Sequence, residues 1–351
     1  MSGGLFFDAR YIKPVHDGIS RFSANLFAAV QKLTPVTAII CDEQQLEKLP
    51  AGTRWIKLHK PTSPLEPLSS LLLNKHEPDL VFSPMQTIGS FGRKFKLVLT
   101  VHDLIYYRHP KPPGYLNPII RFGWRLFHLS YAPERMLLAG CEAVATVSET
   151  TAADLRKHKL TKRPIGVVYN APESIAAETK TRVTEKKLVY MGTFMPYKNV
   201  ETLIRAVGLL PEFKLELLSK IDSDRKSELA KLAKELGAHV VFRNGVTDAE
   251  YQAALDSSTA LVSASLDEGF GIPLVEAMSR AVPVIVSDIP IFREVAGEAG
   301  RFFSPLDPES LAASVRALEK QPPAIEELQR QAARFNWDES ANSLLNFIRQ
   351  V

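Results

Sequence analysis

Short apolar runs recur along this chain, and most are followed by a longer stretch in which apolar residues return at helical spacing. The runs are Val98–Val101, Ala143–Val147, Leu188–Met191, Leu215–Leu218, Val240–Phe242, Ala260–Val262 and Pro283–Val286. Helices are predicted over Glu201–Leu210, Ser223–Leu236 and Asp248–Leu255, with Ser223 and Asp248 as N-caps. Apolar strands that alternate with helices are typical of parallel sheets with both faces covered. The chain is therefore predicted to be α/β.

The chain is long enough for two such sheets, because 351 residues exceed the size at which one hydrophobic core keeps growing. A strand-like run at Ile165–Tyr169 leads into a polar, charged stretch from Glu173 to Lys187, and new β/α alternation begins at Leu188. We place the linker in this stretch. The prediction is an N-terminal domain over residues 1–172 and a C-terminal domain over residues 173–335.

Several classes of protein are disfavoured by composition. Cys41 and Cys141 are the two cysteines and have no CxxC spacing, so neither a disulfide framework nor a zinc site is indicated. The N-terminus is strand-like at Leu5–Phe7 and does not resemble a signal peptide. The apolar runs of the chain are too short to span a bilayer. The expectation is a cytoplasmic protein, either soluble or peripheral on the inner face of the membrane.

Charge is distributed unevenly along the chain. Residues 1–175 hold 22 Lys and Arg against 14 Asp and Glu, whereas the remainder holds 21 against 25. A basic N-terminal half attracts anionic partners, such as a phosphorylated acceptor, a membrane surface or nucleic acid. An ordinary solvated surface explains the excess equally well. Aromatic and basic residues from Tyr115 to Arg135 predict an amphipathic helix that either lines an acceptor groove, rests on a membrane or, as we favour, packs into the N-terminal core.

The most specific segment runs from Glu268 to Met278. Two carboxylates, Glu268 and Glu276, are separated by seven residues, with a glycine-rich loop first and an apolar helix start second. Gly269 and Gly271 let the backbone approach a ligand, and a helix N-terminus offers amides to phosphates. A carboxylate in such a loop can accept hydrogen bonds from sugar hydroxyls, and the second carboxylate, on the helix, can hold a ribose. The alternative is a solvated loop residue followed by a residue that stabilises the helix dipole.

A second segment, Gly192–Asn199, follows a strand and opens a helix. Its Lys198 stands at a helix N-terminus, where the macrodipole disfavours a cation. A bound diphosphate would compensate for this placement. An exposed surface lysine is the alternative.

Together these segments resemble family 4 of the retaining glycosyltransferases, which have the GT-B fold of two Rossmann-like doubly wound domains facing across a cleft. The resemblance covers nearly the whole chain. It includes Phe7–Arg10, Gly18–Phe22, Val101–Leu104, Val147–Glu149, Gly245–Val246 and Ser287–Phe303. It is closest to bacterial mannosyltransferases of surface polysaccharide assembly. It implies an acceptor-side N-terminal domain, a donor-binding C-terminal domain and a last helix, residues 336–351, that returns to complete the first domain.

The resemblance also assigns residues to the donor. Glu268 faces the sugar, Glu276 holds the ribose, and Lys198 grips the diphosphate that leaves. Many members carry an arginine where this chain has Thr193, which places one phosphate contact in doubt. The implied donor-binding residues are Gly18, Thr193, Lys198, Gly245, Val246, Glu268, Phe270, Gly271, Ile272, Leu274, Val275 and Glu276. The implied catalytic residues are His102, Lys198 and Glu268.

Two of these residues lie in the N-terminal half. Gly18 precedes a predicted helix, where backbone amides meet the diphosphate, although an ordinary turn explains it as well. His102 follows a buried strand, and in this context it is expected at the sugar, where it positions a hydroxyl or the acceptor.

The expected reaction moves a hexose, mannose from GDP-mannose, from a nucleotide-sugar co-substrate to a hydroxyl of a glycan or lipid-linked acceptor, without any cofactor. Asp222-Ser223-Asp224 is the one Asp-x-Asp, and N-capping explains it better than a metal does, so no metal is expected. The alternatives are a transferase that uses UDP- or another nucleotide sugar, and a GT-B nucleotide-sugar epimerase. A non-enzymatic nucleic-acid binder is the least favoured, and nucleic acid is not an expected partner.

Overall fold

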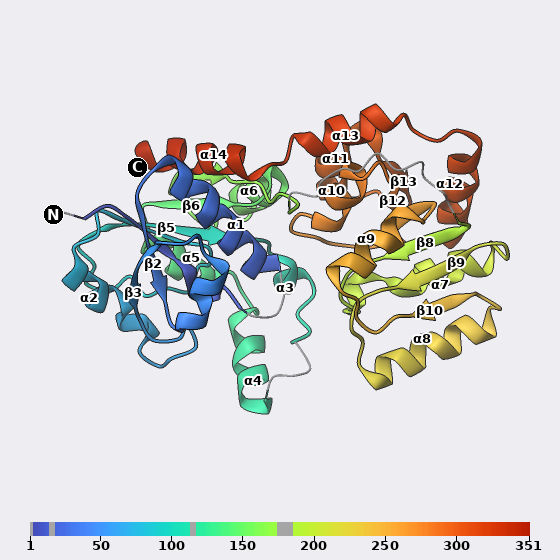
Figure 1. Ribbon diagram of the computed structural model, residues 1–351. Helices are drawn as coiled ribbons and strands as arrows, with labels where there is room; N and C mark the ends of the chain where they lie inside the picture. Colours follow the sequence, from blue (N-terminus) through green and yellow to red (C-terminus); the bar gives the residue numbers. More distant parts are fainter. Residues whose placement is uncertain (1–2, 14–17, 113–116, 174–184) are drawn as a thin grey trace. The chain divides into compact units, whose positions relative to one another are not determined.

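The computed structural model describes residues 3–13, 18–112, 117–173 and 185–351. It divides into two compact units, each with its own parallel sheet (Figure 1). Unit 1 holds Met1–Ala171 and Asn336–Val351, and unit 2 holds Pro172–Phe335. Of the linker predicted at Glu173–Lys187, residues 174–184 lie outside the described residues.

Unit 1 is built on a seven-stranded sheet with the order β3-β2-β1-β4-β5-β6-β7, in which every pairing is parallel. The strands are β1 (Leu5–Asp8), β2 (Val36–Ile40), β3 (Arg54–Lys57), β4 (Leu80–Ser83), β5 (Lys96–Val101), β6 (Ala143–Thr146) and β7 (Ile165–Val167). The α-helices are α1 (Gly18–Leu33), α2 (Ser69–Leu73), α3 (Ile105–Arg108), α4 (Pro118–Phe127), α5 (Ala132–Ala139), α6 (Glu149–Lys157) and α14 (Trp337–Arg349).

Unit 2 is built on a six-stranded parallel sheet with the order β10-β9-β8-β11-β12-β13. The strands are β8 (Lys187–Tyr190), β9 (Lys214–Leu217), β10 (Val240–Phe242), β11 (Ala260–Ser263), β12 (Val284–Ser287) and β13 (Arg301–Phe303). The α-helices are α7 (Val200–Gly208), α8 (Ser223–Glu235), α9 (Asp248–Asp256), α10 (Ile272–Ser279), α11 (Pro290–Ala296), α12 (Pro308–Lys320) and α13 (Ile325–Ala333).

The predicted α/β class with two parallel sheets is confirmed. Central strands such as β6 and β11 are buried along their whole length, which explains their continuous apolar sequence. The order of both sheets reverses at the first strand of the unit, where β1 lies between β2 and β4 and β8 lies between β9 and β11. In such sheets the carboxyl ends of the strands beside the reversal are where loops form ligand sites.

The last helix, α14, belongs to unit 1 and packs against α1 and β7. Trp337 makes an edge contact with Phe22 of α1 at 6.1 Å between ring centroids. Phe347 lies so close to Gly166 of β7 that a Cβ there would stand 2.5 Å from its ring. Gly166 is therefore needed for this close approach.

Two local predictions are wrong. The N-caps are Asp222 and Thr247, each one residue before the predicted Ser223 and Asp248, and their side chains accept the N–H of the third helical residue. The capped helices themselves begin as expected.

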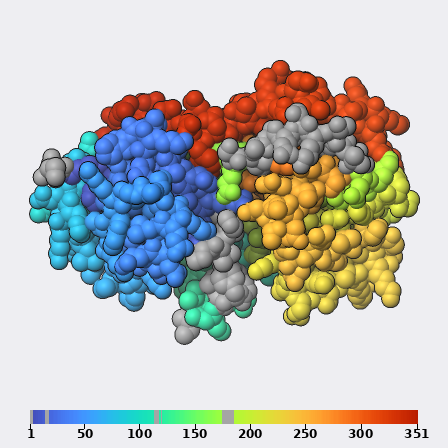
Figure 2. Space-filling model, viewed as in Figure 1, coloured from blue at the N-terminus to red at the C-terminus, as the bar shows by residue number. Residues whose placement is uncertain are grey.

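The amphipathic helix predicted from Tyr115 to Arg135 is instead two helices, α4 and α5, and residues 113–116 lie outside the described part of the chain. Packing of its apolar face into the core is also wrong for Phe122 and Leu126, which are 63% and 52% exposed. Other residues of the same helix, among them Trp124 and Phe127, line a cavity of unit 1 that is described below with the site. The space-filling view shows α4 at the surface (Figure 2).

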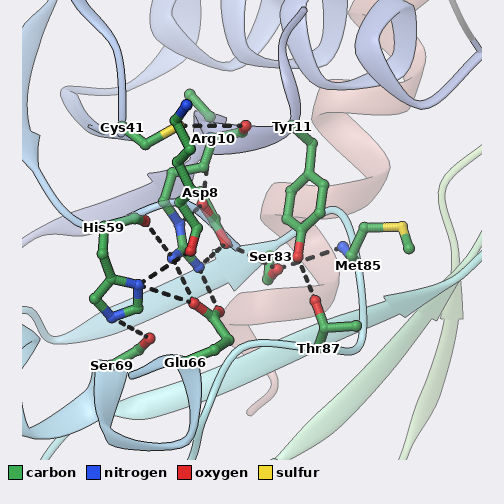
Figure 3. A network of polar contacts seen from close by, with 12 residues as sticks. Asp8, Arg10, Tyr11, Cys41, His59, Glu66, Ser69, Ser83, Met85 and Thr87 are labelled. Atoms are coloured by element: carbon green, nitrogen blue, oxygen red, sulfur yellow. Dashed lines mark hydrogen bonds and ion pairs between the residues drawn. The ribbon is translucent and has the colours of Figure 1, made fainter. Parts of the chain in front are cut away.

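A buried ion-pair network lies at the end of β1 (Figure 3). Arg10 donates from Nε and Nη2 to the Asp8 carboxylate at 2.7 and 2.9 Å, and from Nη1 and Nη2 to the Glu66 carboxylate at 2.8 Å each. All three residues are buried. Burial alone would lower the pKa of Arg10, but the two carboxylates outweigh it and raise the pKa above its usual range. The guanidinium is therefore permanently charged, and it ties β1 to the segment around Glu66.

Candidate functional site

Lys198 and Glu268, predicted from separate segments, meet in unit 2. Lys198 ends a short 3-10 turn (Pro196–Lys198) before α7, and Glu268 lies in the loop between β11 and α10. The Lys198 Nζ forms an ion pair with Glu268 Oε1, which also accepts a hydrogen bond from Ser265 Oγ at 3.1 Å. Their side chains are 12% and 16% exposed, so Lys198 is not an exposed surface lysine. The anion beside this helix start is a carboxylate of the chain itself.

Backbone contacts hold these two loops together. The Leu266 N–H donates to the Tyr197 carbonyl at 2.7 Å. Asn199 has a left-handed backbone with φ 51°, and its Nδ2 donates to the carbonyls of Ala264 and Pro305 at 3.2 and 2.7 Å. Lys198 and Glu268 are therefore brought together by bonds between their loops, and not only by their own charges.

Thr193 begins the loop that follows β8. Its side chain is exposed, and its carbonyl accepts a hydrogen bond from Tyr190 Oη at 2.6 Å. Arg225 of α8 reaches this loop, where its Nε donates to the Phe194 carbonyl at 3.3 Å. The rest of its guanidinium pairs with Glu201 and Glu228. Arg225 is thus engaged by protein groups, and it does not take the place of the arginine that many members of the family have at the position of Thr193.

The glycine-rich loop ends at Gly271, the N-cap of α10. Its φ of 96° is a left-handed backbone that favours glycine, and an added Cβ would stand 3.1 Å from the Phe292 ring. Ile272 begins the helix. The Leu274 N–H donates to the Gly271 carbonyl at 3.0 Å, and the Leu274 and Val275 side chains are buried. Phe270 is buried against Phe335, with ring centroids 5.3 Å apart.

Glu276 lies on α10 and is only 4% exposed. Its Oε2 accepts a hydrogen bond from Tyr251 Oη of α9 at 3.0 Å. It is the fifth residue of its helix, beyond the first turn, so stabilisation of the helix dipole does not explain it. The sequence did not indicate Tyr251, because an aromatic residue on a helix normally indicates packing. Gly245 and Val246 lie in the loop after β10, where Gly245 has φ 102° and donates its N–H to the Leu218 carbonyl at 2.9 Å.

Gly18 and His102 lie in unit 1. Gly18 is the exposed first residue of α1, and the residues that precede it, 14–17, lie outside the described part of the chain. His102 follows β5, and its Nε2 donates to the Pro84 carbonyl at 2.7 Å. The ring makes an edge contact with Phe22 at 5.0 Å. These contacts fix the orientation of the imidazole.

His102 forms part of the wall of a chamber of about 580 Å³ within unit 1. Most of the wall is aromatic or aliphatic. The aromatic and titratable side chains of the wall include Tyr106, Tyr107, Trp124, Phe127, His128 and Glu134. None of these was predicted as a site residue, although Trp124 and Phe127 belong to the segment for which an acceptor groove was one interpretation.

Glu134 of α5 is the buried charge-bearing residue of this wall, with 1% of its surface exposed. Burial raises its pKa from 4.5 to about 7, although hydrogen bonds from Tyr107 and Gln86 act in the opposite direction. The Tyr107 hydroxyl lies 3.4 Å from Oε2. The carboxyl is therefore protonated in a large fraction of molecules near neutral pH.

This shift predicts a stability that depends on pH. Because the pKa of Glu134 is raised in the folded protein, this group contributes its full stabilisation below about pH 4.5. That contribution is lost as the pH rises to about 7 and beyond. Glu134→Gln, which is always neutral, should therefore gain stability relative to the parent as pH rises, by up to about 3 kcal/mol. Denaturant unfolding of both proteins from acidic to alkaline pH measures the difference. The control is Leu137→Ala, which changes a residue of the same wall that has no titratable group. Its free energy of unfolding should differ from that of the parent by an amount that does not vary with pH. The same pH dependence in both variants would contradict the raised pKa of Glu134.

Comparisons with known proteins agree with this architecture. The model described as "Glycosyltransferase Family 4" matches residues 23–172, and the model described as "Glycosyl transferases group 1" matches residues 173–335. The chain is 26% identical to the O-antigen chain mannosyltransferase RfbU of Salmonella typhimurium, over 95% of this chain and 96% of that protein. It is 28% identical to the MMP alpha-(1->4)-mannosyltransferase of Mycolicibacterium hassiacum, over 76% of this chain and 67% of that protein.

The fold is also that of solved structures. The sucrose-phosphate synthase of Thermosynechococcus elongatus superposes with a TM-score of 0.75 at 19% identity, over 99% of this chain and 98% of that one. The two family models meet at the boundary between the two units and together match most of both. The chain therefore belongs to glycosyltransferase family 4, is a glycosyltransferase, and has the GT-B fold.

Proposed function

We propose that this glycosyltransferase moves mannose from GDP-mannose, with retention of configuration, to a hydroxyl of a glycan or lipid-linked acceptor. The pairing of Lys198 with Glu268 at the carboxyl edge of the unit 2 sheet is the observation that carries the proposal. It joins a cation suited to a diphosphate with a carboxylate suited to sugar hydroxyls. The choice of mannose rests on the relatives described as mannosyltransferases.

The ion pair suggests how the donor is received. A diphosphate carries more negative charge than one carboxylate, so it competes for Lys198 and frees Glu268 to accept hydrogen bonds from the sugar. The cost of parting the pair is limited because Ser265 remains as a donor to Glu268. Lys198 then stabilises charge that grows on the leaving phosphate as the glycosidic bond breaks.

In this mechanism the acceptor hydroxyl attacks the face from which the diphosphate leaves, and a phosphate oxygen takes its proton. The protein contributes positioning and electrostatic stabilisation. We propose that no metal is needed on the diphosphate. In support of this, Asp222 of the Asp-x-Asp accepts the Arg225 N–H at 2.9 Å as a helix cap, and Asp224 lies in the first helical turn.

The ribose is proposed to bind Glu276. Tyr251 donates a hydrogen bond to Oε2 and helps to fix the orientation of this carboxylate. Calorimetry with GDP-, UDP-, ADP- and dTDP-sugars tests the donor, and GDP-mannose is expected to bind most tightly. Glu276→Ala should weaken its affinity about 10- to 150-fold, because a hydrogen bond to a charged group contributes about 1.5–3 kcal/mol.

Two controls accompany the donor measurement. Glu235→Ala, at an exposed position of α8, should bind as the parent does. Unchanged affinity in Glu276→Ala would remove the ribose assignment. Tighter binding of another nucleotide sugar would show that GDP-mannose is not the donor. Conversion of the donor sugar to its epimer without acceptor would identify the protein as an epimerase.

A second prediction concerns the leaving group. Lys198→Ala should lower kcat by about 10²-fold or more while changing KM less, because the stabilised charge develops in the transition state. Steady-state kinetics at saturating donor measure this. Lys231→Ala, an exposed lysine of the same unit, is the control. If Lys198→Ala kept the parental kcat, Lys198 would have no part in the chemistry.

We also propose peripheral membrane contact through α4 and the turn after it. Ile120, Phe122, Leu126 and Leu129 are 51–76% exposed, and Arg125 is exposed beside them. Among the described residues no helix has both the length and the apolar character to cross a bilayer. Exposed apolar side chains next to arginine favour the surface of a bilayer that contains anionic lipid.

Vesicle sedimentation tests this surface. The double variant Phe122→Ser with Leu126→Ser should bind phosphatidylglycerol vesicles at least several-fold more weakly than the parent, because apolar area is lost from the interface. Leu209→Ser, which changes an apolar residue that is 42% exposed in unit 2, should bind as the parent does. Equal binding of all three proteins would rule out α4 as the contact.

A further inference from the structure

The segment Glu268–Gly271, which leads into α10, has one large apolar side chain, that of Phe270. Gly269 and Gly271 flank it, and Gly271 has a left-handed backbone with φ 96°. Glycine on both sides leaves the backbone many conformations, so this segment needs an anchor to present Glu268 in one arrangement. Phe270 is 4% exposed and supplies that anchor.

Phe335 is the aromatic partner of this anchor. The two rings meet edge-on, with their centroids 5.3 Å apart and their planes at 87°. Phe335 is also buried. An edge-to-face contact between two buried rings constrains the orientation of each ring as well as its position.

The fold of unit 2 brings Phe335 to this place. The helix that precedes it, α13, packs against α10 and α11 (Figure 1). At the end of α13 the Phe335 N–H donates to the Ala332 carbonyl at 3.0 Å and closes a turn. The segment Glu268–Gly271 thus begins α10, α10 supports α13, and the residue after α13 contacts Phe270 of the same segment.

This contact is separate from a larger apolar cluster of the unit. The cluster joins β8 and β9 to α7 and α12, and among its described residues it includes Phe213 but neither Phe270 nor Phe335. Phe213 directly precedes β9, at the amino edge of the sheet. A substitution at Phe213 therefore removes a buried ring of the same size far from the loops at the carboxyl edge.

We propose that Phe335 is a positioning residue of the donor site, which acts by holding Phe270 so that Glu268 meets Lys198. This proposal rests on the proposed function, which assigns that site to the donor. Without the Phe335 ring the segment Glu268–Gly271 samples several arrangements. A donor then binds only the competent fraction of molecules, so the apparent affinity falls by that fraction while the bound state is unchanged.

Hydrogen–deuterium exchange of the full chain without ligand tests the positioning role. The Leu266 and Leu274 amides report on both ends of the loop, since they donate to the Tyr197 and Gly271 carbonyls. Phe335→Leu should speed their exchange about tenfold, because the loop opens more often. Phe270→Leu should have the same effect and the double variant no further effect, because both changes remove one contact.

Two further variants are controls. Phe335→Tyr keeps the ring and should restore most of the parental exchange. Phe213→Leu should leave the exchange of both amides as in the parent. Thermal unfolding of each variant confirms that it folds. Parental exchange in Phe335→Leu, equal acceleration in Phe213→Leu, or additive effects in the double variant would each overturn the proposal.

Steady-state kinetics give an independent measurement. Phe335→Leu should raise KM for GDP-mannose about tenfold and change kcat less than about twofold, because the bound loop is the same. A lower kcat with an unchanged KM would contradict the positioning role. No turnover of GDP-mannose by the parent would overturn the proposed function, whereas the exchange measurements decide the role of Phe335 without a donor.

Discussion

Parallel sheets bring their loops together at one edge, and polar side chains that are buried there must find partners. In unit 1 that requirement is met by Arg10, which binds two carboxylates at once (Figure 3). Removing one member of such a buried cluster costs about 3–5 kcal/mol, because it leaves uncompensated charge inside the protein. Glu66 lies 56 residues from Arg10 in sequence, so the cluster fixes a long connection against the end of β1. Ser83, at the end of β4, donates to Asp8 at 3.3 Å and joins the neighbouring strand to the same cluster.

In unit 2 the polar side chains at the corresponding edge of the sheet form an ion pair, Lys198 with Glu268. Lys198 and Glu268 are partly exposed, and each has chemistry that a nucleotide sugar could use. The loops that carry them are joined by Asn199 and by the Leu266 amide, so parting the two side chains would not release the loops. In the proposed function a bound diphosphate would therefore replace one charge interaction with another and would reorganise little else.

Much of this architecture could be predicted from the sequence, because it follows from periodicity. The apolar runs gave strands within one or two residues of their observed bounds, such as Val240–Phe242 for β10. The Glu268 segment and Lys198 stood out through unusual spacing and placement. Tyr251 and Glu134 did not, because an aromatic or a carboxylate on an amphipathic helix has an ordinary structural interpretation, and only three-dimensional contacts distinguish it. The exposed face of α4 was missed for a related reason: apolar side chains usually indicate a core, and the sequence does not reveal that other residues of this helix line a cavity.

Four carboxyl groups with little exposed surface differ chiefly in their partners. Glu66 faces a guanidinium, Glu268 an ammonium, and Glu276 a tyrosine hydroxyl, whereas Glu134 contacts the neutral groups of Tyr107 and Gln86. A carboxylate beside a cation remains charged at little cost, but one in apolar surroundings takes a proton instead. The same side chain thus serves as a structural anchor at the end of β1, as the counterion of Lys198 in unit 2, and in the chamber as a carboxyl whose pKa is raised by burial. Glu134 thus stands apart from the other three carboxyl groups, because burial and not a charged partner dominates the shift of its pKa.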